Sequence, residues 1–408
     1  MYRLKQLGPG LLFAAAAIGV SHLVQSTRAG AEYSWGLLWA LLLANFFKFP
    51  FFEFTTRYTA TTGKSVLQGY YDLHPNWLRA YTLLSLGTMF TIQTAVTVVT
   101  AGIAEYLFGA FFFDHFWVVV ISLLCLAIIV LGKFYFLDIF IKAIMIVLAL
   151  STTIAFFQAL QHPIELADFK AVFPTGSGLL FLVAFMGWMP APLDVSIWQS
   201  LWWIDKSKIQ SIESLRKNTA FDFRLGYWST LVMGIFFLGL GALILHPEGR
   251  TFPTAGVAFA EELIGIYQSQ LGNGAMIIIG FAALTAMFST TLTTLDASPK
   301  AMASGLRILF PNRQQVWTKK IFWLGILFLG TLAIFFFLTA HMGRLITVAT
   351  LISFLSSPLL AYLNYRLVFQ EDFPESARPS KGLKLLSFFG LVFLPGFCIL
   401  YLWSLIYS

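Results

Sequence analysis

Long apolar runs separated by short polar segments fill the chain from end to end. A helix that crosses a bilayer needs about 20 apolar residues, and polar connections separate the runs that reach this length. The only long connections are 204–223 and 247–271, and the second predicts a short helix near 255–267. The pattern predicts an all-α integral membrane protein with eleven spans: 8–28, 33–56, 80–104, 115–132, 135–161, 178–203, 224–246, 272–295, 319–339, 343–369 and 384–406.

Composition supports a membrane protein and excludes a soluble one. Hydrophobic residues make up 58% of the 408 residues and charged residues only 11%, whereas soluble domains carry about 25% charged residues. The lipid bilayer must therefore cover much of the apolar surface. Both cysteines, Cys125 and Cys398, lie inside apolar runs and are expected to pack there rather than form a disulfide or a metal pair.

The basic residues are distributed as topology signals. The formal net charge is +7, and 20 of the 26 lysines and arginines fall in the loops on the side of the N-terminus, against four on the other side. Positive loops stay in the cytoplasm. We therefore expect an inner-membrane protein with a cytoplasmic N-terminus and an external C-terminus, and the charge gives no reason to expect nucleic acid as a partner.

The first span carries polar residues halfway along its length. Gly19 and Ser21 lie at its centre, and His22, Gln25 and Ser26 share one helical face at i, i+3 and i+4. This face is either a helix–helix contact held by polar side chains or one wall of a substrate pathway. His22 is open to three roles: metal ligand, proton carrier, or a plain hydrogen-bonded residue.

The sixth span is predicted to be broken. Pro190 and Pro192 have no N–H group, so the helix must open and free the carbonyls of Met186 and Trp188. Unpaired carbonyls at membrane depth need a cavity or a bound group. Met189 lies at the break and adds a thioether, which is a soft ligand suited to transition metals.

Charged residues inside spans raise further hypotheses. Asp194 follows the break, where it either binds substrate or caps the second half-helix. Lys48 in the second span is expected to extend toward the interface or to pair with Glu53, and Glu53 also suits Arg57 one turn later.

Polar stripes on three other spans also suit a central pathway, although each could equally be interhelical glue. They are spaced at helical intervals in the third, eighth and tenth spans: Gln93, Thr97 and Thr100; Ser289, Thr293 and Asp296; and Thr350, Ser353 and Ser357. The interrupted spans, the first and the sixth, are five apart, so the two halves would be inverted. Such pairs of broken helices are typical of transporters with inverted repeats.

Enzyme signatures are missing from the sequence. It contains no phosphate-binding Walker loop, no HExxH zinc motif and no nucleophile elbow. We therefore expect neither an enzyme nor a cofactor.

Two regions resemble the Nramp divalent-metal transporters. The residues that carry the likeness are GPG at 8–10, the tetrad that begins at Gly19, the AGA, LLW and LLAN segments that follow, TGK at 62–64, and Met189–Pro190. The resemblance implies a LeuT-type fold in which 8–161 and 178–369 are inverted repeats and 384–406 is an extra helix. It also implies alternating access, often coupled to protons.

The chain departs from the family at the metal motif itself. The family's Asp-Pro-Gly-Asn in the first span is replaced by Gly19, Val20, Ser21 and His22, and Ala191 stands where the family has a histidine. One hypothesis is a rebuilt cation site, in which His22, Met189 and Asp194 are the metal ligands. Gly19, Ser21, Gln25, Gln93, Met186 and Trp188 would complete this substrate site. The alternatives are transport of another small solute, such as an organic ion, and a membrane sensor that transports nothing.

Overall fold

The structure is a computed structural model that describes residues 9–111, 115–132, 134–161, 169–208, 211–249, 252–253, 256–272, 274–312, 315–338 and 342–407. Side chains are described for the same residues except 9, 11, 134–144, 275, 338, 342–350 and 404–407. The expected stripe residue Thr350 and the basic N-terminal residues thus lie outside the described side chains.

The described residues form helices and no strand, which confirms the all-α class. Helices lie over every expected span: α1 (Pro9–Ala17) with α2 (Thr27–Tyr33), α3 (Leu38–Thr62), α5 (Pro75–Phe108), α6 (Phe116–Val130), α7 (Phe134–Ala159), α8 (Ser177–Trp188) with α9 (Val195–Ser207), α10 (Ile212–Leu240), α12 (Ala275–Leu309), α13 (Lys320–Leu338), α14 (Met342–Phe369) and α15 (Lys381–Tyr407). Within the described ranges, six helical stretches are long and apolar enough to cross a membrane by themselves.

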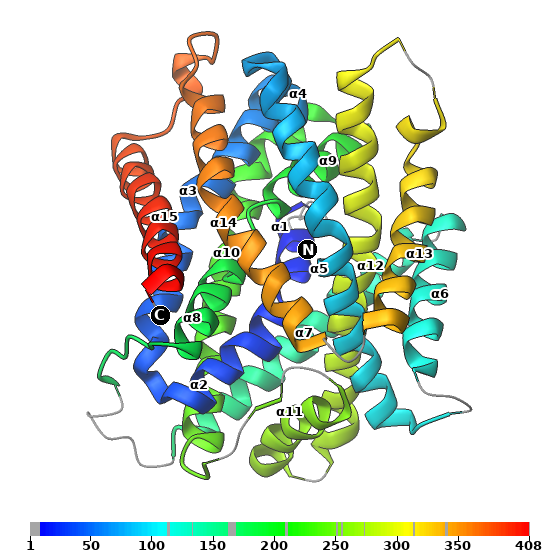
Figure 1. The fold of residues 1–408 in the computed structure, drawn as a ribbon, viewed down its shortest axis with the longest axis vertical. Helices are drawn as coiled ribbons and strands as arrows, with labels where there is room; N and C mark the ends of the chain where they lie inside the picture. The colour runs from blue at the N-terminus through cyan, green and yellow to red at the C-terminus, as the bar shows by residue number, and fades with distance from the viewer. Residues whose placement is uncertain are drawn as a thin grey trace.

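Two shorter helices lie at opposite ends of the bundle. Helix α11 (Gly256–Leu271) confirms the short helix expected near 255–267, and Figure 1 shows it at the lower end. Helix α4 (Val66–Leu73) at the upper end was not expected from the sequence. It begins where the Ser65 hydroxyl accepts a hydrogen bond from the Gln68 N–H at 3.2 Å, which is a standard N-cap.

The first span is interrupted at its centre. Helix α1 ends at Ala17, and a π-helical segment, η2 (Val20–Ser26), precedes α2. The sixth span is likewise divided into α8 and α9, as the two prolines predict. The interruptions meet, because the Ser21 hydroxyl oxygen lies 3.3 Å from the Pro190 carbonyl oxygen. Figure 1 shows these segments inside the bundle, with α15 at one edge and α6 and α13 at the other.

Close backbone contacts hold the broken first span against α10 and the segment that follows it, η5 (Gly241–Leu245). A methyl group on Gly30 would lie 1.9 Å from the Leu238 carbonyl oxygen, and one on Gly241 would lie 2.1 Å from the Thr27 carbonyl oxygen. Only glycine permits this approach. The α2 half of the first span is therefore fixed tightly to α10 and η5.

Candidate functional site

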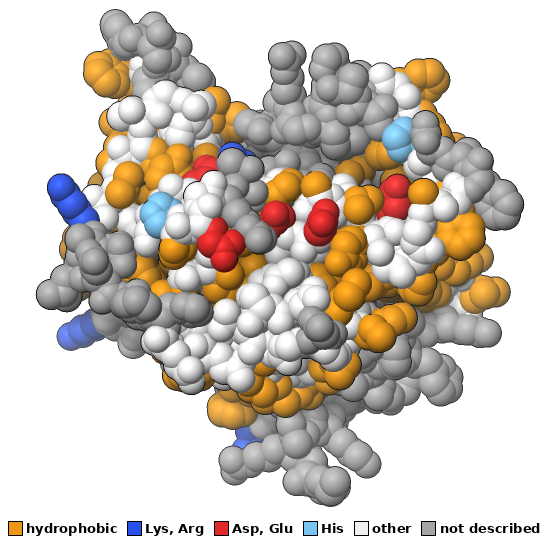
Figure 2. Space-filling model, turned by 90° about the horizontal axis from the view of Figure 1, so that it is seen from below, with side chains coloured by type: hydrophobic (Ala, Val, Ile, Leu, Met, Phe, Trp, Pro, Cys, Tyr) orange, Lys and Arg blue, Asp and Glu red, His pale blue; other side chains and the backbone are white. Residues whose placement is uncertain are grey.

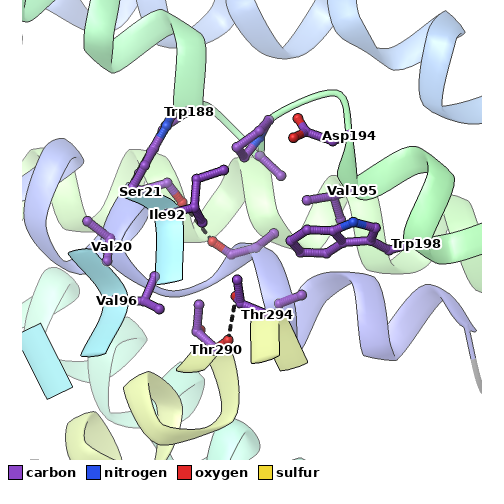
Figure 3. A pocket seen from close by; sticks show the side chains of 14 residues that line it. Val20, Ser21, Ile92, Val96, Trp188, Asp194, Val195, Trp198, Thr290 and Thr294 are labelled. Carbon is purple, nitrogen blue, oxygen red and sulfur yellow. Dashed lines mark hydrogen bonds between the residues drawn. The ribbon is translucent and has the colours of Figure 1, made fainter. Parts of the chain in front are cut away.

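A small pocket lies where the two helix breaks meet, between α1, α5, α8, α9 and α12 (Figure 3). It offers about 40 Å³ to the centres of water-sized molecules. Since one water needs roughly 10–15 Å³ on this measure, the pocket has room for about three waters or for a small, partly hydrated ion. Trp188 and Trp198 lie on opposite sides of it.

Asp194 supplies the negative charge of the pocket. The residue is 8% exposed, and its Oδ1 has no hydrogen-bond partner. It occupies the N-cap position of α9, yet its side chain makes no capping hydrogen bond. The carboxylate is therefore positioned by the helix break, and its Oδ1 remains available to a ligand.

Hydroxyl groups provide the other polar oxygens. Ser21, Thr290 and Thr294 line the pocket, and each hydroxyl donates to a backbone carbonyl, as Thr294 does to Thr290 at 2.7 Å. A hydroxyl that donates its proton keeps lone pairs for a cation. One carboxylate with several neutral oxygens suits a hard cation such as Mg²⁺ or Mn²⁺ better than a soft one.

The freed carbonyls at the end of α8 are occupied by a side chain of the protein. The Lys48 ammonium on α3 lies 2.8 Å from the Met186 carbonyl oxygen, 2.6 Å from that of Gly187, 2.9 Å from that of Met189 and 3.4 Å from that of Ala191. The expected pairing of Lys48 with Glu53 is therefore wrong. Lys48 lies fully inside the protein, where the break provides its acceptors.

Glu53 instead pairs with Arg57 one turn later, as the spacing predicts. In the eighth-span stripe, Asp296 forms an ion pair with Lys320 of α13, which fits the alternative of an interhelical contact. Neither carboxylate lines the pocket, so Asp194 is the acidic side chain of its described lining.

His22 and Met189 do not line this pocket. The Nδ1 atom of His22 lies 2.8 Å from the Ser21 hydroxyl, and Nε2 lies 2.9 Å from the Thr230 carbonyl oxygen. The Met189 sulfur is 3.6 Å from the Ser26 hydroxyl. Both side chains face Gly234 of α10. The structure thus does not bring the three expected ligands together at the pocket, and both nitrogens of His22 already have polar partners.

The remaining expected site residues fall into two groups. Trp188 lines the pocket, and its indole N–H has no hydrogen-bond partner. Gly19 lies next to the pocket residue Thr290, because a methyl group on Gly19 would be 2.5 Å from the Thr290 hydroxyl oxygen. Gln25 is buried away from the pocket, and its amide oxygen has no partner. Gln93 donates to the Thr291 carbonyl at 3.3 Å and so joins α5 to α12.

The pocket faces of α5 and α12 are one residue away from the expected stripes. Ile92 and Val96 line the pocket in place of Gln93 and Thr97, and Thr290 and Thr294 do so in place of Ser289 and Thr293. Trp198 and Lys48 were not among the expected site residues. A lysine in mid-span with no carboxylate one turn away was the available signal for Lys48.

Within the described residues, no group of three His, Cys, Asp or Glu side chains could hold a metal. A cation in this pocket would therefore be bound by one carboxylate together with hydroxyl, carbonyl and water oxygens. Such a ligand set resembles the sparse protein ligation that Mg²⁺ accepts, since this ion keeps several of its waters.

The lower end of the bundle bears mainly acidic side chains, and Figure 2 shows carboxylates spread across this face. The described charged residues on the helix ends and turns there comprise five acidic side chains and two basic ones: Glu32, Glu105, Glu248, Glu261 and Glu262, with Arg28 and Lys170. A larger cavity of about 630 Å³ opens beside Glu248 and His246. A surface of this sign raises the local concentration of cations.

Comparisons with known proteins agree with this architecture. Residues 10–404 match the family profile described as natural resistance-associated macrophage protein-like, or Nramp. An uncharacterised protein of Pasteurella multocida (strain Pm70) is 33% identical over 401 residues, which are 97% of this chain and 91% of that protein.

Two solved structures share the fold at low sequence identity. A manganese transporter of Eremococcus coleocola superposes with a TM-score of 0.67 at 12% identity, covering 98% of this chain and 86% of its own. Mhp1, a nucleobase-cation-symport-1 family transporter, superposes with a TM-score of 0.59 at 15% identity, covering 98% and 92%. The arrangement of helices is therefore that of the LeuT-type transporters.

Proposed function

The chain belongs to the Nramp family of metal-ion transporters, and we propose that it moves a divalent cation by alternating access through the pocket at Asp194. The observation that carries this proposal is the buried carboxylate of Asp194, whose Oδ1 has no hydrogen-bond partner, at the junction of two broken helices. An ionisable side chain in a membrane span is costly and is a functional-site hypothesis by default.

The chemistry of the pocket favours one class of divalent cation. Its polar side chains offer oxygen atoms, and the Met189 sulfur lies elsewhere, so hard divalent ions such as Mg²⁺ and Mn²⁺ are favoured over Cd²⁺. The small free volume of the pocket also favours a partly hydrated metal ion over an organic ion.

The remaining features of transport extend this proposal. The N-terminus would be cytoplasmic in the inner membrane, and the acidic face of Figure 2 would then lie outside. Residues 8–161 and 178–369 would be the inverted repeats, and 384–406 an additional helix. A proton would be the coupling ion, since a buried carboxylate can bind either a cation or a proton.

Uptake into proteoliposomes tests the function. Purified protein should take up Mn²⁺ or Mg²⁺ with saturation, and an inward proton gradient should increase the rate. Liposomes that contain the Asp194→Asn variant should show background flux only. Uptake that is equal with and without the pH gradient would refute the proton coupling but not the cation. Single-cysteine labelling from each side of the membrane tests the orientation.

A further inference from the structure

The strongest polar constellation outside the pocket is the site of the Lys48 ammonium. This residue comes from the middle of α3, is fully buried, and lies against carbonyl oxygens that belong to the break of another span. Three of its oxygen contacts, to Met186, Gly187 and Met189, are between 2.6 and 2.9 Å. An ammonium has three protons, so these three acceptors use all of its hydrogen-bonding capacity.

The geometry of α8 explains why a cation is needed there. The last carbonyls of a helix have no intrahelical partner. The Met189 N–H satisfies the Phe185 carbonyl at 3.0 Å, but Pro190 has no N–H for the Met186 carbonyl. The dipole of α8 adds a partial negative charge at the same end. A cation at this position is therefore favoured by the orphan carbonyls and by the helix dipole.

Carbonyl groups arranged in this way are a general cation site. Rings of backbone carbonyls replace the hydration shell of K⁺ in channels, and in transporters with broken helices the unwound carbonyls and half-helix C-termini coordinate the coupling cation. In this protein the Lys48 ammonium occupies such a position.

We propose that Lys48 is a tethered cation that fills the carbonyl site at the α8–α9 break. The site is then closed to alkali cations, and transport needs none as a co-ion, a consequence that rests on the function proposed above. Removal of the side chain opens a site for a monovalent cation of similar size, K⁺ or NH₄⁺.

Thermal unfolding of the full-length protein in detergent tests the proposal without any transport assay. The melting temperature, Tm, is measured in the chlorides of K⁺, NH₄⁺ and choline at equal ionic strength. Three variants are compared with the wild type. Lys48→Ala empties the site, Lys48→Met removes the charge but fills the space, and Lys64→Ala is the matched control, because Lys64 is an exposed lysine paired with Asp72.

The expected results differ between the variants. Lys48→Ala should be less stable than the wild type in choline and should regain about 2–4 °C, with saturation, as K⁺ or NH₄⁺ increases, because a ligand that binds only the folded state stabilises it. Lys48→Met should be destabilised in all three salts alike. The wild type and Lys64→Ala should have the same Tm in the three salts.

Three outcomes would overturn the proposal. The first is a Lys48→Ala variant whose Tm is the same in all salts, and the second is a wild type that K⁺ or NH₄⁺ stabilises with saturation. The third is a Lys48→Ala variant that folds in none of the salts, because a vacated cation site should bind the ion that is supplied. A variant that folds only with K⁺ or NH₄⁺ supports the proposal. Failure of divalent uptake would refute the proposed function and leave these results unchanged.

Discussion

Replacement of Asp194 by asparagine removes the charge of the pocket and very little else. The two side chains have nearly the same shape, and Asp194 makes no capping hydrogen bond that the change could break. The hydroxyls of Ser21, Thr290 and Thr294 already donate to carbonyls and offer only lone pairs. They cannot compensate for the lost negative charge.

The size of the effect follows from the burial of the pocket. Removal of one partner of a buried ion pair costs about 3–5 kcal/mol, because the remaining charge is left uncompensated. At about 1.4 kcal/mol for each factor of ten, the dissociation constant for Mn²⁺ or Mg²⁺ should rise by roughly 150- to 5,000-fold. The Tm without metal should stay within a few degrees of the wild type.

Titration calorimetry with Mn²⁺ on purified protein measures this change. The matched control is Asp72→Asn, which neutralises an exposed carboxylate on α4 that pairs with Lys64 at 2.8 Å. The control should bind Mn²⁺ with the affinity of the wild type. A folded Asp194→Asn variant whose dissociation constant lies within about threefold of the wild type would show that the cation binds elsewhere.

Three further substitutions separate the pocket from its surroundings. His22→Ala should lower the free energy of unfolding by about 2–4 kcal/mol, as measured in denaturant, and leave Mn²⁺ affinity within a few-fold; a selective loss of affinity would make His22 a ligand. Gly19→Ala pushes a methyl group toward the Thr290 hydroxyl and should weaken Mn²⁺ binding in calorimetry more than it lowers the Tm; unchanged affinity would mean that this wall adapts. In Gly241→Ala the added methyl group would collide with the Thr27 carbonyl oxygen, so the free energy of unfolding should fall by about 1–3 kcal/mol. An unchanged Tm would disprove the tight contact.

The break in the sixth span could be predicted from the sequence, and the one in the first span could not. Pro190 and Pro192 lack donors, so a continuous helix is impossible there whatever surrounds it. Gly19 only weakens a helix, by about 1 kcal/mol. In the structure Gly19 lies against Thr290, which is far away in the sequence, so this contact could not be read from the first span alone.

The residues of α5 and α12 that line the pocket were predicted less well, because the sequence does not show which face of each helix points into it. Helix α12 carries threonines at 290, 291, 293 and 294, so a polar residue points in almost every direction. On α5 the apolar residues Ile92 and Val96 face the pocket, while Gln93 forms an interhelical bond. A search for polar stripes therefore selects residues that form contacts between helices rather than residues that line the pocket.

The role of Lys48 could not be predicted in full. Glu53 lies five residues further along, which on a helix places it on a different face, so the expected pair was geometrically poor. The actual partners are backbone carbonyls about 140 residues later in the chain. The side-chain pattern of α3 cannot predict hydrogen-bond acceptors that a break in another span creates.

Anomalous scattering from Mn²⁺ in crystals of the full-length protein tests the central claim most directly. The account predicts one strong peak in the pocket, within bonding distance of the Asp194 carboxylate and close to the hydroxyls of Ser21 and Thr294. The peak should be lost in the Asp194→Asn variant. A peak between His22 and Met189, or at the carbonyls that bind Lys48, would contradict the account.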